Sequence, residues 1–298
     1  MKRYLALQKI VEFGSFSKAA TAMGYTQSAL SQMIASLEDE LHIKLLNRYR
    51  TGAKLTYEGK KLYPDILTLI NAYHATIYKS EEILGLETGI VRFGVLTSIS
   101  VHWLPRLIRS FEQLYPKVEF VIHSGDYTSI EEWIRTGEVD FGFVNPKAVS
   151  GLQTDILGEG RMLAILPENH PLTKTSAVPL SELAKEPYIL LEEGHYYEPL
   201  EAFQRIDATP KIKYTIHDDY TIMTMVEAGL GVSILAELIL QRTHYHIAIR
   251  ETIPPVSRVL SIAYKSKDDL PTASRLFIHH IKDMLDYFVK PEHQLPET

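Results

Sequence analysis

The sequence of 298 residues predicts an α/β protein with a small helical N-terminal domain, one long helix and a larger body. Three observations support this prediction. Two short apolar helical patterns meet at a glycine within residues 16–37, and an apolar seam then recurs at helical spacing over residues 62–77. After residue 90, strand-like segments alternate with helical ones. At roughly 100–200 residues per domain, the length allows about two domains and a small one.

Residues 16–37 predict two short helices that cross closely. One apolar stripe comprises Phe16, Ala19, Ala20 and Met23, and a second comprises Leu30, Ile34, Leu37 and Leu41. Gly24 lies between the stripes and can take the positive φ that closes the first helix. Thr26 offers a hydroxyl that can cap the second helix. A further apolar pattern over residues 2–13 predicts a helix packed under this pair.

The outward face of the second helix carries uncharged donors and acceptors, namely Gln27, Ser28, Ser31 and Gln32. Amides and hydroxyls of this kind can pair with base edges in the major groove of DNA, which is wide enough to admit a helix. The pattern therefore favours a helix-turn-helix whose second helix reads bases. The alternative for this stretch alone is a small α-hairpin with a solvated polar face.

Residues 42–55 predict a short β-ribbon, or wing, with a turn at Thr51-Gly52. The wing carries three cations, Arg48, Arg50 and Lys54, which would lie beside the second helix. Phosphate contacts from such cations fix the position of a protein on a duplex. A basic loop is more often merely solvated, but its place directly after a helix-turn-helix favours contact with DNA.

The segments SFSKAATAMGYTQSALSQMIASLEDEL and NRYRTGAKLTYEG carry a long, ordered motif. Through it, residues 4–60 resemble the winged helix-turn-helix of LysR-type transcriptional regulators. The resemblance implies DNA contacts by Gln27, Ser28, Ser31, Gln32 and Arg48, and places Ser15, Ser17 and Lys18 near the DNA backbone. Thr26, Arg50 and Lys54 complete the predicted DNA-binding set. Gln32 stands where the family often has Arg, and Met33 where a polar residue is usual, so the family pattern does not define the base preference of this face.

The charge is distributed unevenly along the chain. The first 60 residues carry nine Lys or Arg and five Asp or Glu, which leaves 22 of the 31 basic and 32 of the 37 acidic side chains to the remainder. A locally basic domain supplies the electrostatic part of DNA affinity, whereas an acidic remainder is not suited to lie along a duplex. The net charge of −6 therefore does not argue against DNA binding.

A long helix is expected to begin after Thr56. Its apolar positions recur close to the spacing of a coiled-coil seam, at Leu62, Ile66, Leu69, Tyr73 and Ile77. Pro64 predicts a bend near residues 60–64, because proline lacks the amide hydrogen and clashes with the preceding turn. The seam can be covered by the chain's own fold or by a second copy, and the family resemblance implies dimerisation here.

From residue 90 the apolar pattern alternates between strand and helix. Helices are expected over residues 100–115 and 128–136, with a last one in PTASRLFIHHIKDMLDYF. Strands are expected at VRFGVL, KVEFVIH, DFGFV, RMLAILP, PYILL, KYTIH, GVSIL, YHIAI and RVLSIAY. Such alternation predicts parallel strands joined by crossover helices.

The resemblance further implies a two-subdomain effector domain like that of periplasmic binding proteins. The predicted domains are then residues 1–58 for DNA binding, 59–88 for the linker helix and a hinge at 86–89, and 89–290 for effector binding, with a polar tail over 291–298. Subdomain I would take residues 89–160 and 268–290, and subdomain II residues 161–267. The chain would cross between them near residues 158–161 and 265–269.

Small ligands bind at the carboxyl ends of parallel strands, where helix N-termini expose amides. Five loops of the body fit that place, and a carboxylate or another small anion would suit them. The proposed effector-contacting residues are Thr97, Ser98, Ser100, Thr128, Asn145, His195, Tyr220 and Thr221. Each hydroxyl taken singly is better explained as a helix cap, so the prediction depends on the convergence of the five loops.

Catalysis is not indicated, because no nucleophile elbow, dinucleotide-binding, Walker or zincin motif occurs. No catalytic residue and no cofactor is expected. His244 and His246 share one face of an expected strand but have no evident third ligand, so no metal site is expected either. A cytoplasmic location is expected from the lack of cysteine, of an apolar span of about 20 residues and of a signal peptide.

These observations predict a homodimeric or homotetrameric transcription factor whose DNA binding or activation is controlled by a small-molecule effector between two α/β subdomains. One alternative is a cytoplasmic solute-binding or enzyme domain with an incidental helical head. Another is a constitutive regulator with an empty cleft. Salt-dependent binding to duplex DNA would exclude the first alternative, and ligand screening would test the second.

Overall fold

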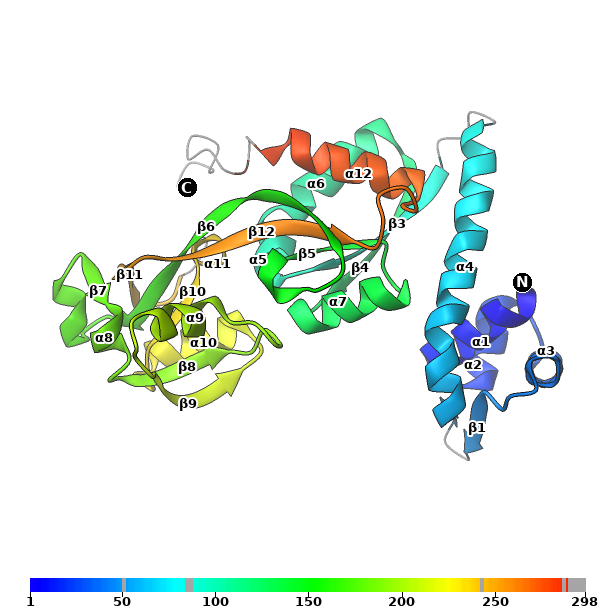
Figure 1. Cartoon of the computed structure of the whole chain (residues 1–298), viewed down its shortest axis with the longest axis horizontal. Coiled ribbons are helices and arrows are strands. Elements are labelled where there is room, and N and C mark those ends of the chain that lie inside the picture. Colours follow the sequence, from blue (N-terminus) through cyan, green and yellow to red (C-terminus); the bar gives the residue numbers. More distant parts are fainter. Residues whose placement is uncertain (50–51, 84–87, 242–243, 286–287, 289–298) are drawn as a thin grey trace. The chain divides into compact units, whose positions relative to one another are not determined.

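The computed structural model describes residues 1–298 except 50–51, 84–87, 242–243, 286–287 and 289–298 (Figure 1). The chain divides into two compact units. The first, which we call the head unit, comprises Met1–Leu86 with Arg135–Glu138, and the second, the body unit, comprises Glu87–Ile134 and Val139–Thr298. Within the described residues, no helix is both long enough and apolar enough to cross a membrane.

The head unit begins with three helices around a common core. They are α1 (Lys2–Phe13), α2 (Phe16–Met23) and α3 (Gln27–Leu41). The Thr26 hydroxyl accepts a hydrogen bond from the Ala29 amide at 3.2 Å and so caps α3. Gly24 ends α2 with a left-handed φ of 69°. The predicted helices, cap and turn are confirmed.

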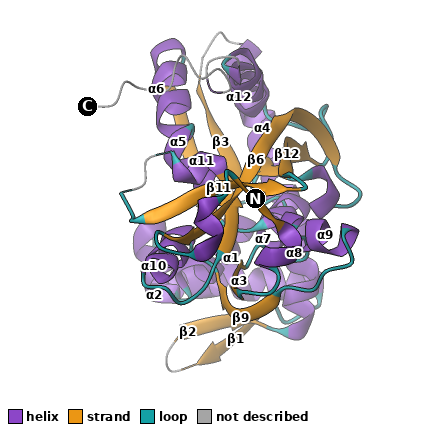
Figure 2. Ribbon diagram, turned by 90° about the vertical axis from the view of Figure 1, so that its left-hand side faces the viewer, coloured by secondary structure: helices purple, strands orange, loops and turns teal. Residues whose placement is uncertain are grey.

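A two-stranded wing follows α3, and Figure 2 shows it as a hairpin. Its strands, β1 (Leu46–Tyr49) and β2 (Gly52–Leu55), pair antiparallel. The Ala53 amide donates to the Gly14 carbonyl at 2.8 Å, which ties the wing to the turn between α1 and α2. Gly52 allows this approach, since a Cβ at that position would lie 2.2 Å from the Gly14 oxygen.

Helix α4 (Tyr57–Ile83) is continuous through Pro64. The Thr56 hydroxyl accepts a hydrogen bond from the Gly59 amide at 2.8 Å and confirms the predicted start. The bend expected near Pro64 stays a prediction, and so does the hinge, most of which lies outside the described residues.

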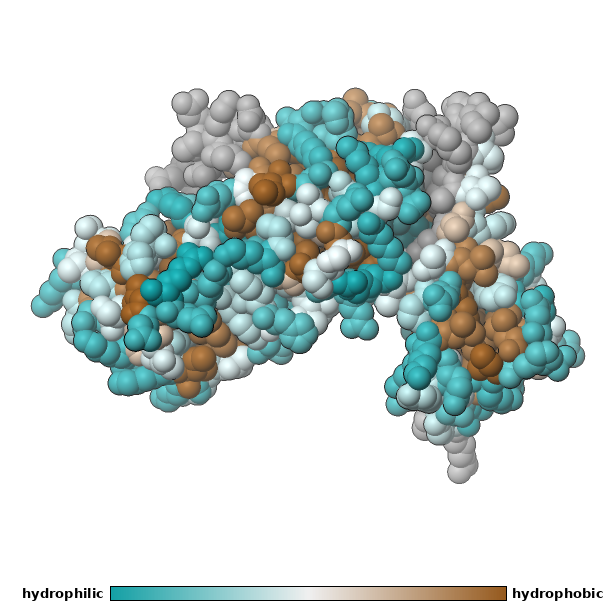
Figure 3. Space-filling model, in the orientation of Figure 1, coloured by the Kyte–Doolittle hydropathy of each residue, from teal (hydrophilic) through white to brown (hydrophobic). Residues whose placement is uncertain are grey.

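The apolar seam predicted along α4 is divided between two environments. Leu62 and Ile66 pack into the head core. Leu69 and Ile77 are instead 44% and 38% exposed. Figure 3 shows exposed apolar surface where Figure 1 draws α4. Only the second part of the seam is therefore exposed.

The body unit is built on a mixed eight-stranded sheet in the order β4-β3-β5-β12-β6-β11-β7, with β10 also paired to β6. Its strands are β3 (Thr88–Val95), β4 (Lys117–Ser124), β5 (Phe141–Val144), β6 (Gln153–Pro167), β7 (Ala177–Pro179), β10 (Ser233–Ala236), β11 (Ile247–Ile253) and β12 (Val256–Tyr264). Strand β3 is parallel to β4 and β5, as predicted. Strand β12 is antiparallel to β5 and β6, so the sheet is mixed and the alternation of strands and helices predicted only its parallel part.

Two subdomains with separate cores flank the long strands. Subdomain I adds α5 (Thr97–His102), α6 (Leu104–Leu114), α7 (Tyr127–Thr136) and α12 (Thr272–Asp283) to β3, β4 and β5. Subdomain II is built around the parallel pair β8 (Pro187–Leu191) and β9 (Lys211–Ile216), with α8 (Leu180–Leu183), α9 (Glu198–Arg205), α10 (Asp219–Glu227) and α11 (Glu237–Leu240). The single helix expected over residues 100–115 is two helices, because Pro105 lacks the amide that a continuous helix needs.

The chain passes between the subdomains along β6 and β12, which pair over the whole of β12 (Figure 1). One strand leaves subdomain I and the other returns, which is why they are antiparallel. Val256 belongs to the core of subdomain II and Leu260 to that of subdomain I. The returning crossing therefore lies within β12, upstream of the predicted crossing at residues 265–269.

Candidate functional site

The polar face of α3 is exposed on the head unit. Gln27, Ser28 and Gln32 are exposed and Ser31 is half-buried, whereas Leu30 on the opposite side is fully buried. The apolar stripe of the helix therefore determines which side faces the core. The opposite side presents amides and hydroxyls outward, where they could contact the bases of a duplex.

Side chains of α2 and the wing hold this polar face in place. The Arg48 guanidinium donates to the Ser31 hydroxyl at 3.1 Å and lies 4.4 Å from the centre of the Phe16 ring. The Ser17 hydroxyl donates to the Gln27 side-chain oxygen at 3.0 Å. The wing cation and the start of α2 thus join the outward residues of α3 in one continuous polar surface.

The other predicted DNA-binding residues lie around that surface. Ser15 caps α2 by accepting the Lys18 amide at 3.4 Å, and the Thr26 and Ser28 hydroxyls lie 3.0 Å apart. The side chains of Lys18 and Lys54 are exposed. Arg50, at the tip of the wing, lies outside the described residues.

A cavity of about 260 Å³ lies between the two subdomains of the body unit. Loops at the ends of β3, β4, β8 and β9 line it together with β12, so four of the five predicted strand ends meet there, whereas the loop after β5 does not line it. The lining residues with polar side chains include Ser98, Asp126, Glu192, Glu193, Asp219 and Arg258.

Two of the predicted effector residues, Thr97 and Ser98, line the cavity. Ser100 and Thr221 do not, because their hydroxyls bond within their own helix starts, to the Thr97 carbonyl at 2.9 Å and to the Asp218 carboxylate at 2.5 Å. These two hydroxyls therefore make local contacts at the start of a helix and do not face the cavity. Tyr220, whose amide bonds the same carboxylate at 3.3 Å, is not among the lining residues either.

Thr128, Asn145 and His195 connect the subdomains beside the cavity and do not line it. The Thr128 hydroxyl accepts the His195 amide at 3.0 Å. The Asn145 amide donates to the Glu198 carboxylate at 2.8 Å, and the Tyr127 hydroxyl donates to the same oxygen at 2.8 Å.

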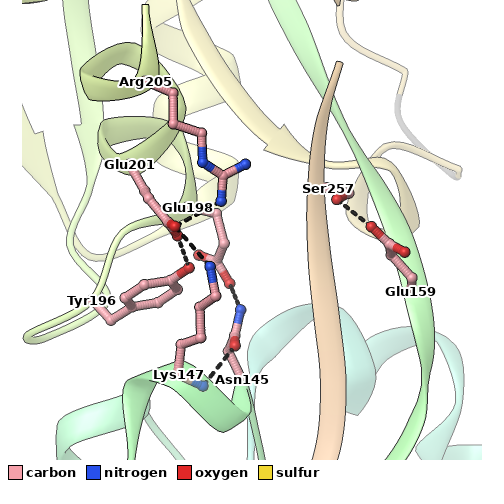
Figure 4. Close-up of polar contacts among 8 residues, drawn as sticks. All are labelled: Asn145, Lys147, Glu159, Tyr196, Glu198, Glu201, Arg205 and Ser257. Atoms are coloured by element: carbon pink, nitrogen blue, oxygen red, sulfur yellow. Dashed lines mark hydrogen bonds and ion pairs between the residues drawn. The ribbon is translucent and has the colours of Figure 1, made fainter. Parts of the chain in front are cut away.

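Figure 4 shows a second connection next to that of Asn145, between Lys147 of subdomain I and Glu201 of α9, 2.7 Å apart. Hydrogen bonds from Lys147 and Tyr196, with a smaller contribution from Arg205, lower the pKa of Glu201 to about 2 against the opposing effect of burial. Glu201 therefore stays ionised at physiological pH. The subdomains are connected by the ion pair of Lys147 with Glu201 and by the hydrogen bond of the buried Asn145 side chain with Glu198.

Replacement of Gly194 by alanine is expected to separate these contacts. Gly194 has φ +91°, and an added Cβ would lie 2.1 Å from the Thr128 hydroxyl, so the bond between Thr128 and the following amide should break. We expect the unfolding free energy of the body unit to fall by about 1–3 kcal/mol in urea titrations. Gly158→Ala in β6 is the matched control, since nothing lies within 4 Å of a Cβ there. Equal losses of unfolding free energy in both variants would show that the contact of Thr128 with the loop of Gly194 does not stabilise the body unit.

Among the described residues that line the cavity, Arg258 is the one cation, and the sequence did not indicate it. It is 6% exposed and donates to the Ser98 hydroxyl at 2.9 Å. Burial alone would lower its pKa, but Tyr127, Glu193, Glu198 and Asp219 outweigh burial and raise it. The residue comes from the antiparallel strand β12, so a search at the ends of parallel strands could not find it.

The carboxyls that surround Arg258 are themselves perturbed. Burial raises the pKa of Glu193 well above its usual value, with Glu198, Asp219 and Asp126 adding to the rise and Arg258 opposing it. Burial also raises the pKa of Asp219, to about 6. No group of three His, Asp or Glu side chains in the described part of the chain could hold a metal ion.

The chain matches two family models. Residues 1–60 match the bacterial regulatory helix-turn-helix protein of the lysR family, and residues 84–286 match the LysR substrate binding domain. The transcriptional regulator YvbU of Bacillus subtilis is 32% identical over 279 residues, which cover 93% of this chain and 95% of that protein. The transcriptional dual regulator GltC of the same species is 28% identical, with 89% of each chain covered.

Solved structures have the same fold. Full-length OxyR from Pseudomonas aeruginosa superposes with a TM-score of 0.69 at 23% identity and covers 95% of both chains. CbnR in complex with its target DNA gives a TM-score of 0.67 at 17% identity, with 95% of this chain and 98% of that chain covered. The exposed polar helix, the wing, the two-subdomain body and the family models together show that the chain belongs to the LysR family of transcriptional regulators.

Proposed function

We propose that the head unit binds operator DNA through α3 and the wing, and that a small molecule in the cavity of the body unit controls this binding in the cytoplasm. The observation that carries the proposal is the exposed row of Gln27, Ser28, Ser31 and Gln32 with Arg48 beside it. Such amides and hydroxyls suit base edges, while Arg48, Lys18 and Lys54 suit phosphates.

A second copy of the chain fits the exposed part of the α4 seam. Leu69 and Ile77 are large apolar side chains that stay 44% and 38% exposed on a helix whose neighbouring turns are buried in the head core. A homodimer through this segment would present two α3 helices to a two-fold operator, as the symmetry of helix-turn-helix sites requires.

The control step would use the contacts that connect the subdomains. Asn145–Glu198, Thr128–His195 and Lys147–Glu201 all join one subdomain to the other next to the cavity. A ligand that binds one arrangement of the subdomains better than another shifts the equilibrium by the difference between its two affinities. That shift would be transmitted to the head units of the oligomer.

The effector was expected to be a carboxylate or another small anion. Arg258 offers one positive charge to such a ligand, but Glu193, Glu198 and Asp219 already face it. The positive charge that the cavity could offer to an anion is therefore already shared with acidic side chains.

The DNA-binding part of the proposal is tested by titrating fluorescent duplexes at several salt concentrations. For each phosphate that a side chain neutralises, log K should fall with log[salt] by a slope of about 0.9. Arg48→Ala should lower that slope by about one. Binding that is indifferent to salt would favour a solute-binding protein with an incidental head.

Thr97→Ala and Ser98→Ala are expected to abolish the response to effector while DNA affinity in the absence of effector stays within a factor of about two. Both residues line the cavity of the body unit and neither belongs to the head unit. The measurement is the affinity for operator DNA with and without the compound that raises the Tm of the wild-type protein. Loss of DNA binding itself would refute this division of roles.

A further inference from the structure

The cavity of the body unit has an unusual charge composition for an anion site. Four of its lining residues are acidic, namely Asp126, Glu192, Glu193 and Asp219, against a single arginine, Arg258. With all of them ionised, three negative charges would lack a matching positive charge within the lining. His217, the remaining titratable lining residue, is exposed.

Two of these carboxyls are almost completely buried and accept no hydrogen bond from another residue of the described chain. Glu193 is 7% exposed and Asp219 is 6% exposed. Within the described residues no other residue donates a hydrogen bond to either carboxyl, and Asp219 accepts one from its own backbone amide. The other two are different, since Asp126 accepts the Ser129 amide at 2.8 Å and Glu192 accepts the Tyr197 hydroxyl at 2.6 Å. A buried carboxyl with so few donors is costly when it is ionised, and both of these line the cavity.

Arg258 does not supply the missing donor. It donates a hydrogen bond to the Ser98 hydroxyl at 2.9 Å, and its charge is shared among Glu193, Glu198 and Asp219. Glu198 already accepts hydrogen bonds from Tyr127 and Asn145 through one oxygen, while its other oxygen, Oε2, is buried without a partner. The acceptors around the cavity therefore outnumber the donors.

We infer that the effector is a small organic cation, a protonated amine, amidine or guanidine, that donates hydrogen bonds to Glu193 and Asp219. This inference rests on the proposed function of the cavity. A bare metal ion fits less well, because no three candidate ligands in the described chain converge. A cavity of about 260 Å³ lies below the size of typical drug-sized sites, so the cation is small.

Binding of such a cation is expected to be coupled to the release of protons from Glu193 and Asp219. Glu193 faces Glu198, Asp219, Asp126 and Arg258, and Asp219 faces Arg258 and Asp218. Burial raises both pKa values, that of Asp219 to about 6, so part of the site is protonated in the empty protein near neutral pH. A cation favours the ionised carboxyls. Its binding should release protons, and its affinity should rise as the pH increases from about 5 to 8.

The experiment is calorimetric titration of the full-length protein with 1,4-diaminobutane and agmatine at pH 5.5, 6.5 and 7.5. Succinate and 1,4-butanediol are the matched acidic and neutral probes. We expect the two cations to bind, with affinity increasing with pH and with heats that depend on the ionisation enthalpy of the buffer. Neither succinate nor the diol should bind.

Three variants locate the binding site. Glu193→Gln and Asp219→Asn should each weaken binding of the cations at least tenfold, and Glu168→Gln, an exposed residue of the same subdomain, should not change it. Removal of a buried charge should leave the Tm of the first two variants equal to or above that of the wild type, so a loss of binding would not reflect unfolding.

The titrations distinguish an error in the charge of the effector from an error in the effector site. Binding of succinate instead of the cations would overturn the cation inference and leave the cavity as an effector site. Cations that bind equally well to Glu193→Gln and Asp219→Asn would also overturn it. If no probe of either charge binds and none alters DNA affinity, the proposed effector control fails together with the inference.

Discussion

Replacement of both Gln27 and Gln32 by alanine is expected to weaken binding to the specific operator by roughly a hundredfold or more. Both amides are exposed on α3, and a bidentate contact from a glutamine to a base is worth about 1–3 kcal/mol. Binding to unrelated duplex should change little, because phosphate contacts provide that affinity and neither glutamine carries charge. The variant should therefore lose specificity more than it loses affinity for DNA in general.

The operator for this experiment can be selected from a random duplex library with the wild-type protein, and affinities then follow from fluorescence anisotropy. Gln113→Ala, which replaces another exposed glutamine, on α6 of the body unit, is the matched control and should behave as the wild type. Arg48→Ala gives the complementary pattern, with a lower salt slope on every duplex. Equal loss on specific and unrelated duplexes in the double glutamine variant would show that α3 does not read bases.

Replacement of Arg258 by methionine is expected to destabilise the body unit by roughly 3–5 kcal/mol at pH 8, the cost of leaving buried charges without their partner. Glu193, Glu198 and Asp219 would then face one another with no cation between them. The loss should be smaller at pH 5. Carboxyls whose pKa is raised in the folded state are protonated there at little cost, and their ionisation destabilises the fold as the pH rises through the folded pKa.

Urea unfolding followed by tryptophan fluorescence measures this effect directly. Both tryptophans of the chain, Trp103 and Trp133, belong to the body unit, so the signal reports on that unit alone. Arg161→Met is the matched control. Arg161 pairs with Glu237 and Glu251 at the surface, with its own side chain 58% exposed, and the expected loss is at most about 1 kcal/mol. A pH-independent loss in the Arg258 variant would mean that its packing, and not its charge, is what stabilises the cavity.

The sequence by itself determined the head unit almost completely. Local signals are strong there: Gly24 and Thr26 mark a helix end and a helix start, and apolar side chains at helical spacing fix which face of α3 is buried. Because that buried face is set by neighbours in the sequence, the outward face with Gln27 and Gln32 followed from the same pattern. The strand and helix order of the body was also largely predictable, through its apolar periodicity.

Tertiary structure decided the pairing of the body strands and the content of the cavity. Whether β12 runs parallel or antiparallel to β6 depends on contacts about 100 residues apart in the chain, which no local pattern encodes. That pairing brings Arg258 to Glu193 and Asp219, and it is burial among these groups that perturbs their pKa values. Nothing in the sequence indicates that an arginine in an apolar strand will lie near a glutamate in a loop. Their charges acquire a shared function only where the fold removes them from water.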